Sequence, residues 1–198
     1  CKETAPGGSN LDVQKACDQA AQQGISVVFL PAAQYGFSGN VNVPDGITVL
    51  GEGSRTLCYA YGNAGLFFSI AGKNVRLTRL TMRGPSTAWT DANGPNPNNT
   101  EAIQDVGHPN LRVDHCELSG FAAAVEFDNE ATGQIDHCSI HDNPVIGLGY
   151  GVDASTGSYV LVTDNEFGDC RHCLASQGDP LGQGYRPTHW EFRHNRVY

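Results

Sequence analysis

The sequence predicts an all-β fold, a parallel β-helix or solenoid with a short capping helix at its N-terminal end. Two observations favour this class. The 198 residues include 24 Gly and 10 Pro, a composition typical of many short strands joined by tight turns. One strand-and-turn pattern also recurs along the chain, as expected of coils that bury their apolar faces against their neighbours. The length suits a single domain, residues 1–198.

The repeat reads apolar, polar, apolar, two polar turn residues, one small polar residue or Cys, polar, apolar. The segments 110–118 (NLRVDHCEL) and 159–167 (YVLVTDNEF) are two examples. Equivalent core positions are separated by 28, 36, 22, 27 and 30 residues. Uneven spacing is expected, because loops can lengthen between strands that stay in register. The predicted core positions are Val49, Leu77, Val113, Ile135, Val162 and Phe192.

The longest interval contains residues 83–100 (RGPSTAWTDANGPNPNNT), which we interpret as an excursion loop between coils. An antiparallel β-sandwich is the alternative fold, but sandwiches rarely repeat one turn motif at the same place in every strand. Asn98 in this loop begins an Asn-Asn-Thr sequon, so it is the predicted glycosylation site in a glycosylating host.

A different pattern occupies residues 1–24. Ser9 or Asn10 can cap a helix that stops at Gly24. The apolar run ISVVFLP that follows reads as a buried strand and begins the coils expected over 25–198. A helix placed before the first coil would cover an exposed strand edge, so we expect it to cap the solenoid.

Residues 20–33 (AAQQGISVVFLPAA), Tyr35 and residues 43–53 (VPDGITVLGEG) carry a resemblance. They resemble the helix, strand and glycine-rich turn that open proteins of the pectate-lyase-like superfamily, and the later coils resemble that group's repeat. The resemblance implies a right-handed parallel β-helix. It implies little about activity, because the group includes lyases, hydrolases and noncatalytic proteins. Its Asp-Asp and Gly-His-Gly hydrolase motifs are absent here.

Seven cysteines indicate an oxidising compartment, and hence an extracellular or cell-surface location. Cys1 is either the lipid-bearing first residue of a processed lipoprotein or an ordinary half-cystine of a trimmed chain. Cys116 and Cys138 occupy the same turn position of adjacent coils, which is within disulfide reach. They are either bonded or merely stacked. The disulfide candidates are Cys17, Cys58, Cys116, Cys138, Cys170 and Cys173.

The Cys-x-x-Cys segment near the C-terminal end contains the main catalytic candidates, Arg171 and His172, with His141 on a related turn. An arginine can neutralise a substrate carboxylate while a histidine abstracts a proton, as β-elimination from a uronic acid requires. Asp142 and Asp169 are expected to stack on one another, where they could hold calcium. The alternative, which we favour, is a purely structural segment.

Asp114 and Asp136, each followed by His, are expected to line one ridge of the coils. They are candidate ligands for a divalent cation, although a solvated column of polar turn residues is the interpretation we favour. A set of aromatic side chains could stack on sugar rings. Its members are Tyr59, Tyr61, Trp89, Tyr150, Tyr185 and Trp190.

The net charge of −9 disfavours nucleic acid as a partner, and no apolar stretch is long enough to cross a membrane. We expect a noncatalytic extracellular protein that contacts a polysaccharide or assembles head to tail. The alternative is a polysaccharide lyase acting on an acidic glycan. The missing hydrolase motifs and only three lysines favour the noncatalytic role.

Overall fold

A computed structural model describes residues 2–5, 8–62, 64–86, 90–91, 100–177 and 184–198 of the chain. Cys1, Trp89, the predicted glycosylation site Asn98 and most of the predicted excursion loop lie outside the described residues.

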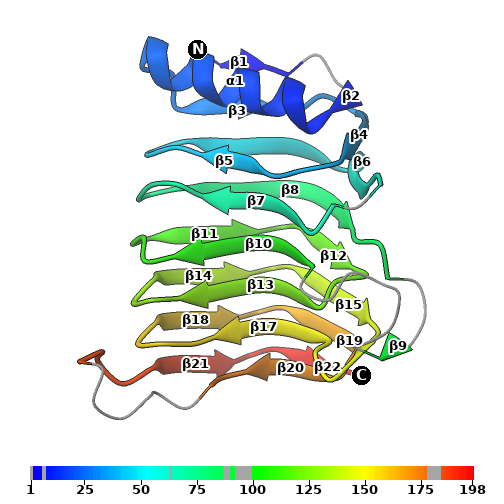
Figure 1. The fold of residues 1–198 in the computed structure, drawn as a ribbon, viewed down its shortest axis with the longest axis vertical. Helices are drawn as coiled ribbons and strands as arrows, with labels where there is room; N and C mark the ends of the chain where they lie inside the picture. Colours follow the sequence, from blue (N-terminus) through cyan, green and yellow to red (C-terminus); the bar gives the residue numbers. More distant parts are fainter. Residues whose placement is uncertain (1, 6–7, 63, 87–89, 92–99, 178–183) are drawn as a thin grey trace.

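The described chain is mostly β, with parallel sheets curled into a half-barrel. Successive passes of the chain stack as layers along the long axis (Figure 1). One sheet has 14 strands in the described part of the chain. They are β1 (Glu3–Thr4), β2 (Gly8–Ser9), β3 (Val27–Phe29), β4 (Ala33–Phe37), β6 (Thr48–Ala60), β8 (Arg76–Arg83), β11 (Leu111–Asp114), β12 (Glu117–Ser119), β14 (Thr132–Asp136), β15 (Ser139–Asn143), β18 (Tyr159–Thr163), β19 (Glu166–Cys170), β21 (His189–Arg193) and β22 (Arg196–Val197).

The second sheet lies across the core from β11, β14 and β18, and its described strands number six (Figure 1). They are β5 (Val41–Val43), β7 (Leu66–Ile70), β10 (Glu101–Val106), β13 (Ala123–Asp128), β17 (Tyr150–Ala154) and β20 (His172–Ala175). A short parallel pair joins β9 (Thr90–Asp91) to β16 (Val145–Ile146).

The register read from the sequence is confirmed. Each predicted core position is paired with the next in a parallel strand pair, and all but the last are fully buried. The pairs are Val49 with Leu77, Leu77 with Val113, Val113 with Ile135, Ile135 with Val162, and Val162 with Phe192. The repeat therefore located the strands correctly.

The prediction of mostly β structure with parallel strands is confirmed, but the finer prediction of a right-handed β-helix solenoid is not. In the larger sheet, one long strand in a layer can pair with two shorter strands of the next layer that are separated by a turn. Strand β8 pairs in this way with β11 and β12, and β6 pairs with β3 and β4. Continuous strands of this kind join neighbouring faces into one curved sheet.

Helix α1 (Asn10–Gln23) lies at the N-terminal end of the stacked layers, as predicted (Figure 1). Ser9 is its N-cap and forms a capping box with Asp12, while Gly24 ends the helix with a φ of 68°. Buried Val13 and Ala16 pack into the core that the first strands form. None of the described helices is long and apolar enough to span a membrane.

The predicted disulfides are wrong: all six candidate cysteines are free thiols. Cys116 and Cys138 instead donate from Sγ to backbone carbonyls, with Asp114 O and Asp136 O at 3.3 and 3.4 Å. The next residue in this turn column, Asn165, accepts from the backbone N–H of Cys138 at 2.9 Å. A small side chain at this position therefore satisfies the turn by hydrogen bonding.

A candidate active site on the six-stranded sheet

Strands β10, β13 and β17 stack on one another (Figure 1), and carboxyl side chains from all three line one cavity. Gln104, Glu126 and Asp153 occupy one register across these three strands. Neighbouring strands are about 4.8 Å apart, so the two carboxyl groups are held close together. Glu101 lies earlier on β10, at the position that pairs with the small Ala123.

These side chains line one cavity of about 260 Å³. The small Ala123 leaves room between the larger groups. Tyr150 stands at one side of the cavity, and its hydroxyl donates to Gly147 O at 3.1 Å. The lining residues are Glu101, Gln104, Ala122, Ala123, Glu126, Leu148, Tyr150, Asp153 and Gln177. Among these described lining residues are three acids, and none of them is Lys, Arg or His.

The electrostatics of the cavity favour a protonated Glu101. Burial, followed by the charges of Glu126 and Asp153, raises the pKa of Glu101 to about 7. Burial also raises the pKa of Glu126 and of Asp153. Each of those two accepts a hydrogen bond that opposes the rise, from Gln104 Nε2 at 3.0 Å and from Ser155 Oγ at 2.9 Å.

This arrangement can perform general acid–base chemistry near neutral pH. Glu101 can hold a proton, whereas the hydrogen bonds to the other two carboxyl groups favour their ionised forms. A buried carboxyl group with a raised pKa, lying beside other carboxyl groups, is characteristic of acid–base sites in enzymes.

Of the sequence-predicted catalytic residues, Arg171 and His172 lie near this cavity without lining it. Arg171 donates from Nη1 to Gly147 O at 2.7 Å, and His172 packs its ring against Tyr150 with centroids 5.7 Å apart. His141 lies on β15, where its Nδ1 is 2.7 Å from Asp142 Oδ2. The structure therefore brings Arg171 and His172 together and leaves His141 apart.

The predicted metal ligands Asp142 and Asp169 come level with one another, because His141 pairs with Gly168 and Asn143 with Cys170. Both residues have a positive φ, of 48° and 50°. Within the described ranges, no group of three or more His, Cys, Asp or Glu side chains is arranged to hold a metal ion. The predicted calcium site stays a prediction.

Asp114 is fully buried and carries an ion pair with Arg76 (2.6 and 2.8 Å). Thr78 Oγ1 donates to it at 2.9 Å, and His115 Nδ1 lies 2.8 Å away. Although burial alone would raise the pKa of Asp114, the bonds from Arg76, His115 and Thr78 hold it well below its ordinary value.

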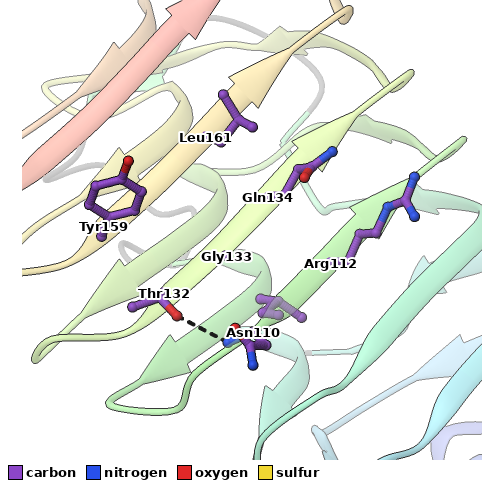
Figure 2. Close-up of a pocket in the computed structure, with 8 residues that line it drawn as sticks. Asn110, Arg112, Thr132, Gly133, Gln134, Tyr159 and Leu161 are labelled. Carbon is purple, nitrogen blue, oxygen red and sulfur yellow. Dashed lines mark hydrogen bonds between the residues drawn. The ribbon is translucent and has the colours of Figure 1, made fainter.

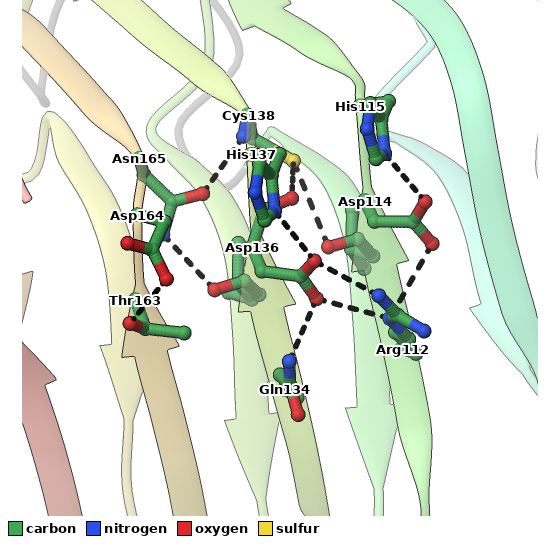
Figure 3. Close-up of polar contacts among 12 residues, drawn as sticks. Arg112, Asp114, His115, Gln134, Asp136, His137, Cys138, Thr163, Asp164 and Asn165 are labelled. Carbon is green, nitrogen blue, oxygen red and sulfur yellow. Dashed lines mark hydrogen bonds and ion pairs between the residues drawn. The ribbon is translucent and has the colours of Figure 1, made fainter. Parts of the chain in front are cut away.

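Asp136 repeats this arrangement one layer on, paired with Arg112 at 3.0 Å and with His137 Nδ1 at 2.9 Å (Figure 3). The rings of His115 and His137 stack with centroids 5.1 Å apart. The carboxylates of Asp114 and Asp136 are thus already bonded to arginine and histidine side chains. This supports the structural interpretation of the ridge.

Sequence reasoning missed the three carboxyl groups, although a signal was present. Gln104, Glu126 and Asp153 are separated by 22 and 27 residues. Those are the same intervals that separate the core positions Val113 and Ile135 and then Ile135 and Val162. The repeat, followed onto the other sheet, would have placed Glu126 beside Asp153.

No family model and no curated protein matches the chain. Among solved structures, the chain is similar to a protein of Parabacteroides merdae described as a "putative glycosyl hydrolase". The TM-score is 0.67 at 14% identity, over 96% of this chain and 91% of the other. A likeness at this identity concerns the fold.

Two expectations are corrected. The predicted membership of the pectate-lyase-like superfamily is wrong, because the described strands form parallel sheets curled into a half-barrel and give no sign of a right-handed β-helix. The expected noncatalytic role is also corrected, because the chain shares its fold with a protein whose description is that of an enzyme.

Proposed function

We propose that this protein is a glycoside hydrolase whose catalytic groups are Glu101, Glu126 and Asp153. The observation that carries the proposal is the single cavity in which Glu101, with its pKa raised to about 7, faces two carboxylates that accept hydrogen bonds. The description of the structural neighbour agrees with this class of enzyme.

In the proposed reaction, protonated Glu101 gives its proton to the glycosidic oxygen as the bond from that oxygen to the anomeric carbon breaks. Glu126 or Asp153 takes a proton from a water molecule, whose oxygen forms the new bond to the anomeric carbon. Both carboxyl groups lie beside Glu101 in the cavity, which suits an acid and a base acting on one bond.

A neutral glycan is the substrate class that fits the cavity best. Its described lining contains three acids and no Lys, Arg or His, so a uronic acid carboxylate would be repelled. Tyr150 offers a ring face on which the apolar side of a sugar can pack. The extracellular or cell-surface location stays a prediction.

The test measures reducing-end release from neutral polysaccharides and hydrolysis of aryl glycosides. We expect Glu101→Gln to lower the rate on polysaccharides by roughly 100-fold or more. A nitrophenyl leaving group needs little protonation, so the same variant should retain much more activity on that substrate. Glu126→Gln or Asp153→Asn should lower both rates.

Glu166→Gln is the matched control, because this glutamate is exposed on β19 and forms an ion pair with Arg196. It should keep wild-type rates. Full polysaccharide hydrolysis by Glu101→Gln, or no hydrolysis of any glycan in the panel by the wild-type protein, would refute the proposed function.

A further inference from the structure

A groove crosses strands β11, β14 and β18 of the larger sheet (Figure 2). These strands lie across the core from the six-stranded sheet that carries the proposed active site (Figure 1). The groove encloses about 360 Å³. Its floor is the backbone at Leu111 and Gly133, which are paired in register. One wall contains Asn110, Thr132 and Tyr159, and the other contains Arg112, Gln134 and Leu161.

Strand register explains the shape of the groove. The residues of the second wall, Arg112, Gln134 and Leu161, follow one another in register across the three strands. In the first wall Thr132 pairs with Tyr159, and Asn110 N donates to Thr132 Oγ1 at 3.1 Å. The groove is therefore a straight channel along the direction in which the layers stack.

Tyr159 gives the channel an aromatic wall. Its side chain is 45% exposed, and one ring face stacks on His189 at 4.7 Å and 9°. Tyr159 lines the groove, and its neighbour in register on the side away from His189 is the shorter Thr132. Amide, hydroxyl and guanidinium groups from the remaining wall residues flank this ring (Figure 2).

Three other classes of ligand fit this groove poorly. An acidic chain would find no unpaired cation, because Arg112 already contacts Asp136 at 3.0 Å and Asp114 at 3.6 Å. A peptide adding as a strand needs a free sheet edge, yet β11, β14 and β18 are each paired on both sides. Nucleic acid is disfavoured by the net charge of −9.

We propose that this groove is a binding site for a neutral glycan chain, separate from the proposed catalytic cavity. A ring face flanked by hydrogen-bonding side chains suits a sugar, which is apolar on one side and carries hydroxyl groups at its rim. A second hollow, of about 700 Å³, shares Thr132 with the groove and is lined by Tyr185 and Arg186. The site can therefore extend beyond one or two sugar units.

The experiment is native electrophoresis through gels containing laminarin, xyloglucan, arabinogalactan or galactomannan, with polygalacturonate as the acidic comparison. Wild-type protein is run beside Glu101→Gln, which is expected to hydrolyse the gel far more slowly. We expect retardation in at least one neutral gel. Tyr159→Ala should weaken that binding roughly tenfold, whereas Tyr159→Phe, which keeps the ring, should retain it.

Tyr61→Ala is the matched control, because Tyr61 is also an exposed tyrosine (66%) but does not line the groove. Gln134→Ala, on the opposite wall, should weaken binding as well and tests the groove independently of Tyr159. Unchanged retardation of Tyr159→Ala and Gln134→Ala, retardation by polygalacturonate alone, or no retardation in any gel would each overturn the proposal. Hydrolysis of glycans by the wild-type protein is unaffected by these outcomes, so the proposed function is tested separately.

Discussion

At the scale of single residues, position in the cavity decides what each carboxyl group can do. Glu101, Glu126 and Asp153 are chemically similar, yet the latter two accept side-chain hydrogen bonds, from Gln104 and Ser155. Those bonds stabilise the charged form of their acceptors. Glu101 combines burial with two acidic neighbours, and its pKa rises to about 7 as a result.

The raised pKa of Glu101 predicts how stability depends on pH. Between about pH 4.5, its ordinary pKa, and about pH 7, the folded protein retains a proton that the unfolded chain has lost. Stability contributed by this group is therefore present in acid and lost as the pH rises through this window. Glu101→Gln should melt close to wild type at pH 4 and above it at pH 8. Thermal unfolding in half-unit pH steps measures this.

Glu166→Gln, which removes an exposed carboxyl group, serves as the control and should follow wild type at every pH. A constant difference in melting temperature between Glu101→Gln and wild type, from pH 4 to pH 8, would mean that the pKa of Glu101 is not raised.

At the scale of elements, close approach of neighbouring strands constrains particular glycines. A Cβ at Gly133 on β14 would lie 2.5 Å from Leu111 O and 2.5 Å from Phe127 Cε1. The side chain of Phe127 fills the core behind this strand. Neither a paired backbone nor a buried ring can move far without disturbing its own contacts.

Gly133→Ala should therefore lower the free energy of unfolding by about 2–3 kcal/mol, measured by urea denaturation. Gly168→Ala on β19 is a matched control, since its Cβ would lie 3.7 Å from the nearest atom, His141 Cβ. That change should stay within about 0.5 kcal/mol of wild type. Equal effects of the two substitutions would contradict the close packing at Gly133.

At the scale of the whole molecule, the buried core and the paired strands hold the fold together without disulfides among the described cysteines. Burial raises the pKa of Cys17 to about 12 and that of Cys170 to about 11, so both thiols stay protonated at neutral pH. Their protonation and burial together make them slow to react.

Dithiothreitol should accordingly leave the melting temperature unchanged, and a thiol reagent such as DTNB should react much faster in urea than in the native protein. A structural disulfide stabilises a protein by about 2–4 kcal/mol. A fall of several degrees on reduction would therefore contradict the assignment of these cysteines as free thiols.

The residue pattern alone predicted the parallel register of one strand in each layer, and the capping helix. Val113 and Ile135 could be aligned because an apolar residue recurs at one point of every layer, where it must meet its neighbour in the core. The same argument placed Ser9 and Gly24 at the ends of the helix, because helix caps depend on local backbone chemistry.

Which polar residues share a site, and which cysteines stay reduced, became clear from the packing of the folded chain. Glu101 has no place in the repeat that carries Glu126 and Asp153, and it joins them because Ala123 leaves space beside it. Spacing in the sequence reports the layer on which a residue lies. The direction of its side chain, its burial and its partners are set by packing between layers, and these determine its pKa and its chemistry.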